Sequence, residues 1–171
     1  MFERILGVFR LDVNTFEAIE HDEAATGQAA IIVAFVALLS GLGSGFGAQI
    51  GGGNFFTSFI STLVWAFIGW FLWAAVSFFV GTTFFGGQSN IGEMLRVLGY
   101  AQAPLVLGII PCVGWIIGGI WALIAGFIAI RQGLDIDNLK AFLTAVIGFF
   151  VVVLGNLIIG TIFGGVTSIF G

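Results

Sequence analysis

Charged residues are scarce in this sequence. Asp, Glu, Lys and Arg make up only 8% of its 171 residues, whereas about a quarter of the positions in soluble domains are charged. Apolar residues make up 59%, and the mean hydropathy is +1.16. These values exclude an ordinary soluble domain. A chain of this length has room for about four to six membrane-spanning helices and for no separate soluble domain.

Cysteine and histidine are scarcer still. Cys112 is the only cysteine, which excludes an internal disulfide and a metal site built on two cysteines. His21 is the only histidine, so a haem held by two histidines of one chain is excluded as well. Because His21 stands beside Asp22 and Glu23, it fits a hydrated acidic surface better than a metal site. We therefore expect no metal and no cofactor.

The sequence also lacks the patterns that mark several functional classes. It has no basic stripe, so nucleic-acid binding is not expected. No ionisable residue falls near the middle of an apolar segment, which argues against a carboxylate-coupled transporter and against a voltage sensor. There is no Ser-His-Asp set, and the glycine run at residues 51–53 is not followed by the lysine of a phosphate-binding loop. We expect a protein that is not an enzyme.

Apolar segments predict an all-α, polytopic membrane fold with about five transmembrane helices in one domain, residues 26–171. The predicted spans are about residues 26–50, 57–83, 94–110, 113–130 and 141–163. The third span is short, and Gln102 and Pro104 interrupt it, so we expect a kink before Pro111 closes it. Glycines in the second half of the first span predict that its helix ends before the apolar run does.

Residues 1–25 form a separate amphipathic and acidic segment. Apolar residues recur at helical spacing within residues 2–11, which predicts a short amphipathic helix in the membrane interface. With five crossings, every basic residue falls on the N-terminal side of the membrane. These residues are Arg4, Arg10, Arg96, Arg131 and Lys140. The positive-inside rule then places the N-terminus in the cytoplasm and the C-terminus outside.

Glycine and tryptophan are abundant in the predicted spans. The 27 glycines include pairs four residues apart, which favour close helix packing or self-association. These pairs are Gly41 with Gly45, Gly114 with Gly118, and Gly160 with Gly164. Trp115 fits the interfacial aromatic belt. Four tryptophans lie deeper, where we expect them to pack between helices, with a lipid groove as the alternative: Trp65, Trp70, Trp73 and Trp121.

A set of polar residues is predicted to meet at the cytoplasmic face. It comprises Glu17, Glu20, His21, Glu93, Arg96, Tyr100 and Arg131. Glu93 and Arg96 stand about one helical turn apart, so their side chains share a helix face. The set is a candidate recognition patch for a partner. The alternative is an ordinary hydrated interface with snorkelling arginines.

The segment Arg96-Val-Leu-Gly-Tyr-Ala-Gln-Ala-Pro104, with Gly99-Tyr100 and Pro104 as its motif, resembles the Yip domain family of five-span membrane proteins. The hairpin after Pro111 and the stretch from Asp12 to Ala30 share this likeness, which covers most of the chain. The resemblance implies a cytosolic N-terminus and an external C-terminus. Eukaryotic members bind Rab-type GTPases and carry an N-terminal Asp-Leu-Tyr-Gly-Pro motif that this chain lacks. We therefore expect a prokaryotic-type member in the cytoplasmic membrane, without Rab binding.

Two hypotheses for function follow. The first is a membrane scaffold or accessory subunit that organises protein partners or lipid, through close helix packing, self-association and the candidate recognition patch. The second is a small channel or transporter for a lipid or another neutral solute, with its pathway beside Gln102 and Pro104, because interrupted helices line many transport sites.

Overall fold

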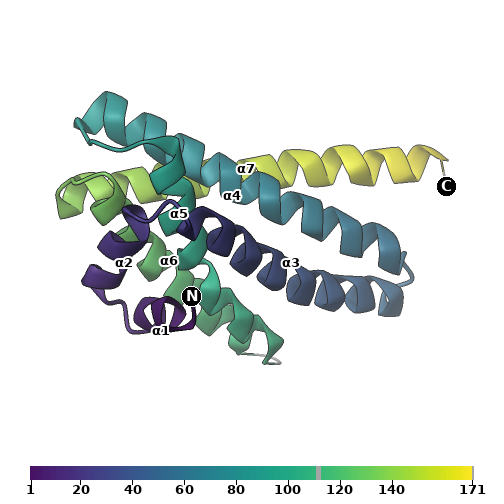
Figure 1. Cartoon of the computed structure of the whole chain (residues 1–171). Helices are drawn as coiled ribbons and strands as arrows, with labels where there is room; N and C mark the ends of the chain where they lie inside the picture. The colour runs from purple at the N-terminus through teal and green to yellow at the C-terminus, as the bar shows by residue number, and fades with distance from the viewer. Residues whose placement is uncertain (111–112, 171) are drawn as a thin grey trace.

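The structure is a computed structural model that describes the backbone of residues 1–110 and 113–170 and the side chains of these residues as far as Ile158. Its described part is all-helical, as the sequence predicts (Figure 1). The elements are α1 (Phe2–Phe9), α2 (Val13–Glu20), α3 (Ala25–Ile50), α4 (Phe55–Phe85), α5 (Ile91–Ala101), the 3-10 helix η1 (Ala103–Ile109), α6 (Gly114–Gly133) and α7 (Asn138–Phe170). Pro111, Cys112 and the packing of the Gly160 and Gly164 pair lie outside this description.

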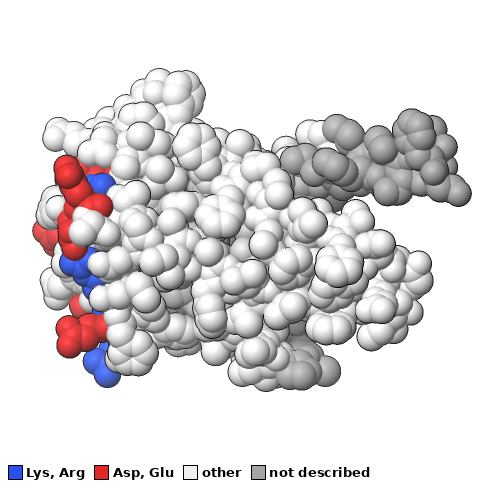
Figure 2. Space-filling model, turned by 45° about the vertical axis from the view of Figure 1, so that its right-hand side comes forward, with Lys and Arg blue, Asp and Glu red and all other residues white. Residues whose placement is uncertain are grey.

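Four of the described helices are long and apolar enough to cross a membrane: α3, α4, α6 and residues Asn138–Ile158 of α7. In the space-filling view, charged side chains gather at the end of the molecule where α1 and α2 lie, and the flanks of the bundle carry none on the visible face (Figure 2). These features give a polytopic membrane fold with a short N-terminal helix. The five crossings and their direction stay predictions.

The third predicted span is not one continuous helix. The α-helix α5 ends at Ala101, and the chain continues after Gln102 as the 3-10 helix η1, in which Pro104 takes an early position. Proline lacks the N–H that would continue the α-helical ladder. A 3-10 helix also rises more per residue than an α-helix, about 2.0 Å against about 1.5 Å. The expected kink is thus a change of helix type within a short segment.

The first predicted span differs from the expectation. Helix α3 continues through the glycine-rich stretch to Ile50, so the predicted early end is wrong. A Cβ atom added to Gly41 would lie 2.7 Å from Leu63 of α4, and one added to Gly45 would lie 2.7 Å from Phe55. The glycines therefore let α3 and α4 approach closely, and this packing offsets the roughly 1 kcal/mol that each glycine costs a helix.

The packed core lies near the charged end, where α2, α3, α5 and α6 meet. Its largest fully buried side chains include Tyr100, Phe16, Met94 and Ile130. Helix α1 packs on α2, and a Cβ atom on Gly7 would lie within 2.2 Å of the Thr15 side chain. The opposite face of α1 leaves Phe2 exposed.

Candidate functional site

The polar residues of α5 begin with a cap that sets the direction of the helix. The Asn90 side chain accepts a hydrogen bond from the Glu93 backbone N–H at 3.0 Å, and the Glu93 carboxylate accepts one from the Asn90 backbone N–H at 2.8 Å. This capping box satisfies two backbone donors at the start of the helix. It starts α5 at the charged end, with Arg96 and Tyr100 on the side that packs into the core.

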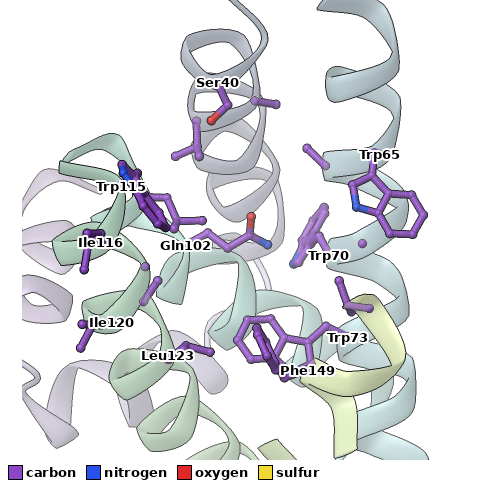
Figure 3. Close-up of a pocket in the computed structure, with 18 residues that line it drawn as sticks. Ser40, Trp65, Trp70, Trp73, Gln102, Trp115, Ile116, Ile120, Leu123 and Phe149 are labelled. Atoms are coloured by element: carbon purple, nitrogen blue, oxygen red, sulfur yellow. The ribbon is translucent and has the colours of Figure 1, made fainter. Parts of the chain in front are cut away.

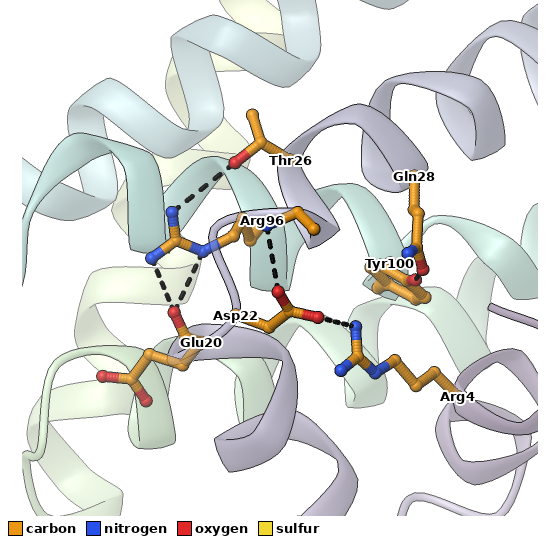
Figure 4. Close-up of polar contacts among 8 residues, drawn as sticks. Arg4, Glu20, Asp22, Thr26, Gln28, Arg96 and Tyr100 are labelled. Carbon is orange, nitrogen blue, oxygen red and sulfur yellow. Dashed lines mark hydrogen bonds and ion pairs between the residues drawn. The ribbon is translucent and has the colours of Figure 1, made fainter.

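Arg96 is buried and fastens α2 to α5. Its side chain is 7% exposed, and its Nε and Nη2 atoms donate hydrogen bonds to the Glu20 backbone carbonyl at 2.9 and 2.6 Å (Figure 4). Its Nη1 atom reaches the Thr26 hydroxyl at 3.5 Å. Glu20 is the last residue of α2, and carbonyls at a helix C-terminus lack partners and carry the negative end of the helix dipole. The guanidinium therefore neutralises and caps this helix end.

Two further contacts tie the N-terminal helices to the bundle. The Arg4 guanidinium forms an ion pair with Asp22 at 2.7 Å, and the other Asp22 oxygen accepts a hydrogen bond from the Ala24 N–H at 3.0 Å. The Arg4 hydrogen bond is the largest cause that lowers the pKa of the Asp22 carboxyl. The Tyr100 hydroxyl donates to the Gln28 side chain (Figure 4). We call the set Arg4, Glu20, Asp22, Thr26, Gln28, Arg96 and Tyr100 the polar clamp.

The candidate patch residues separate into a buried and an exposed group. Gly99, Tyr100 and Pro104 are buried with Arg96, and a Cβ atom on Gly99 would lie 2.7 Å from Ala29 of α3. These residues of the family motif serve contacts within the chain.

Four other patch residues lie toward the surface at the charged end. Glu17 and His21 are exposed, whereas Glu93 and Arg131 are partly exposed. Arg131 donates hydrogen bonds to Gln132 and to Asn138, each at 3.2 Å. A role of these residues in recognition stays a prediction.

Glu20 carries an unusual carboxyl group. Its side chain is 5% exposed, and burial raises the pKa of the Glu20 carboxyl to about 7. Asp135, Glu93 and Glu17 raise this pKa further through their negative charge, whereas His21 opposes them. The carboxyl is therefore protonated in the folded chain at a pH where an unfolded chain has released the proton.

We expect Glu20→Gln to stabilise the protein near neutral pH and above. Between the ordinary glutamate pKa of 4.5 and about 7, the folded state holds a proton that the unfolded state releases, so stability falls as the pH rises through this window. The loss above about pH 7 should reach about 1 to 3 kcal/mol in the wild type and vanish in Glu20→Gln. Thermal unfolding in detergent across this pH range measures it. Glu3→Gln, which removes an exposed carboxylate of α1 that does not contribute to the shifted pKa of Glu20, is the control and should keep the wild-type pH profile.

A groove of about 520 Å³ lies between α3, α4, the α5–η1 junction, α6 and α7 (Figure 3). Its lining includes Ser40, Trp65, Trp70, Trp73, Gln102 and Trp115. Ile120 and Phe149 at its rim are 55% and 42% exposed, so the groove opens on the apolar flank of the bundle. A smaller cavity of about 310 Å³ shares Ser40, Leu105 and Trp115 with it.

Glycines allow close packing at one wall of the groove. A Cβ atom on Gly126 of α6 or on Gly148 of α7 would lie 2.6 Å from the Trp73 ring, so this ring packs between the two helices. Its Nε1 atom is buried and has no hydrogen-bond partner in the described part of the chain. Trp70 differs, because its Nε1 donates to the Leu95 carbonyl at 3.0 Å. Three of the four deep tryptophans therefore line a groove and also pack between helices, while Trp121 donates to the Phe9 carbonyl at 3.1 Å.

Part of this site can be predicted from residue spacing in the sequence. Trp65, Gly69 and Trp73 stand four residues apart, which places them on one helix face, and Asn90 with Glu93 has the spacing of a capping box. No local pattern marks Ser40 or Phe149, because they reach the groove only through the packing of α3 and α7.

Comparison with known proteins identifies the family. The family model described as the Yip1 domain matches residues 6–170, which is nearly the whole chain. No curated protein and no solved structure matches the chain. The matched region contains the Arg96 to Pro104 segment that carries the resemblance, with its glycine, tyrosine and proline buried beside the polar clamp. This chain belongs to the Yip1 domain family.

Proposed function

We propose that this protein is a non-enzymatic membrane scaffold that organises lipid by holding the apolar chain of a lipid molecule in its groove. The observation that carries the proposal is the groove of about 520 Å³ with its tryptophan-rich lining. This volume falls within the roughly 300 to 1,000 Å³ of typical ligand pockets, which are mostly apolar with a few polar groups. In a bilayer, the molecules that surround such an opening are lipids.

The packing at the charged end favours binding over transport. A transported solute would have to pass from the groove through the region where α2, α3, α5 and α6 meet. Tyr100, Met94 and Ile130 are fully buried there, and the polar clamp fastens α2 across the same end (Figure 4). Close-packed interiors of this kind leave few voids larger than a water molecule. The groove thus has the form of a binding site with one open flank.

The experiment fills the groove and counts bound lipid. Gly119 lines the groove, and a Cβ atom added there meets nothing within 4 Å, so Gly119→Phe should place a ring in the cavity without a backbone clash. After purification in mild detergent, native mass spectrometry should find a lipid adduct on the wild type and about tenfold less on Gly119→Phe, since steric overpacking costs about 1 to 3 kcal/mol.

The matched control is Gly47→Phe. Gly47 is exposed on α3, also meets nothing within 4 Å and lies outside the groove lining. This variant should keep the wild-type adduct. An adduct of equal abundance on Gly119→Phe, with its melting temperature unchanged, would show that lipid binds elsewhere and would overturn the proposal.

A further inference from the structure

We infer that the groove selects a neutral lipophilic molecule with a hydroxyl or carbonyl group, and that the side-chain amide of Gln102 recognises this group. The inference rests on the proposed function, because it assumes that an apolar molecule enters the groove. It adds the chemical class of that molecule and names the residue that forms a hydrogen bond with its polar group.

The position of Gln102 is the first argument. This residue follows α5 directly, where the helix gives way to η1. It lines the groove together with Ala37 of α3 and Trp70 of α4, which lie near the middles of these two membrane-length helices. Figure 3 shows its amide pointing into the groove, among the rings of Trp70 and Trp115.

The missing partners of the amide are the second argument. The side chain of Gln102 makes no hydrogen bond with any residue between positions 1 and 110 or between 113 and 158. An amide has two N–H donors and an acceptor oxygen, and hydrocarbon satisfies neither. An amide without a hydrogen-bond partner at this depth costs free energy. A plain acyl chain would leave the amide without a partner, whereas a hydroxyl or carbonyl group on the bound molecule would form a hydrogen bond with it.

The rest of the lining restricts the charge and shape of the ligand. No Asp, Glu, Lys or Arg lines the groove, so an ionised group at this depth would have no counter-charge. The indole rings offer broad apolar faces for the remainder of the molecule. These features fit one polar group on an otherwise apolar body.

The test compares three probes with the same type of branched chain: phytane, which is a hydrocarbon, phytanol, which carries a hydroxyl group, and phytone, which carries a ketone on a slightly shorter chain. The protein is reconstituted in vesicles of phosphatidylcholine with brominated chains, which quench the fluorescence of groove tryptophans. A probe that enters the groove displaces a brominated chain and restores fluorescence. On the wild type, phytanol or phytone should act at about tenfold lower concentration than phytane, since one neutral hydrogen bond with an otherwise bare amide is worth about this factor.

Two variants separate the inference from the proposed function. Gln102→Leu keeps the volume of the side chain and should bring phytanol and phytone to the level of phytane. Gln49→Leu is the matched control, since Gln49 is exposed on α3 outside the groove, and should keep the preference. Gly119→Phe should weaken the response to all three probes about tenfold.

Each outcome has a defined meaning. A preference for phytanol alone or for both polar probes supports the inference and tells which group binds. An equal response of the wild type to all three probes, or a preference that survives Gln102→Leu, would overturn the inference and leave the proposed function standing. Responses that Gly119→Phe does not change would overturn both.

Discussion

Replacing Arg96 with methionine should lower the free energy of unfolding by about 2 to 4 kcal/mol. The substitution keeps a long apolar side chain but removes both hydrogen bonds to the Glu20 carbonyl. The end of α2 then lacks its cap in a buried place. Because α2 is joined to the rest of the bundle at this point, we expect α1 and α2 to detach before the remaining helices unfold. Hydrogen exchange of residues 13–20 should rise in Arg96→Met, and the melting temperature in detergent should fall.

The control for this prediction is Arg131→Met. Arg131 is also an arginine at the charged end, but it is partly exposed, and among the described residues its side chain bonds to the Gln132 and Asn138 side chains, each at 3.2 Å. Its loss should cost less than about 0.5 kcal/mol. Arg96→Lys should fall between the two, because an ammonium group cannot reproduce the fork of two N–H donors. Equal effects of Arg96→Met and Arg131→Met would contradict a clamping role for Arg96.

Gly118→Ala should destabilise the hairpin of η1 and α6 by about 1 to 3 kcal/mol. A Cβ atom at Gly118 would lie 2.7 Å from the Pro104 carbonyl oxygen. This oxygen belongs to the backbone of the 3-10 helix, so it cannot swing away as a flexible side chain can. Either α6 or η1 has to shift. The melting temperature in detergent should fall, and exchange protection of residues 103–109 should fall with it.

Gly119→Ala provides the closest control, since it adds the same methyl group one residue further along the same helix. A Cβ atom at Gly119 meets nothing within 4 Å, and alanine favours the helix over glycine by up to about 1 kcal/mol. This variant should therefore be neutral or slightly stabilised. If Gly118→Ala melted at the same temperature as Gly119→Ala, the close approach of α6 to η1 would be wrong.

The sequence predicted the helical architecture well because lipid leaves few options for a backbone. Long apolar runs without charge become helices, since every N–H and C=O must be satisfied within the segment. Gln102 and Pro104 likewise marked the irregular point of the third span. The bounds predicted for the first span agree with α3, but the continuation of its helix through the glycines could not be predicted locally. Gly41 and Gly45 weaken an isolated helix, and side chains of α4 pack against them in the folded chain.

The candidate site was harder to predict, for a different reason. The polar residues at the charged end suggested a surface for partners, yet Arg96 and Tyr100 are buried in the polar clamp. The acceptor for Arg96 is a backbone carbonyl 76 residues away in sequence. Every residue has such a carbonyl, so no residue type could have indicated this pairing. The spacing of the tryptophans of α4 predicts that they share one helix face, but no such spacing marks their partners on α6 and α7.

The gathering of charge at one end of the bundle bears on how the chain enters a bilayer. Neither the connection between α3 and α4, Gly51–Asn54, nor residues 110–113 contain Asp, Glu, Lys or Arg. During insertion, carrying one such side chain through the centre of the membrane costs about 2.5 to 3.5 kcal/mol. On the predicted five-crossing topology, α3 with α4 and the third span with α6 would each be translocated as a hairpin without moving an ion across. The charged end would then resist translocation and stay on its own side of the membrane.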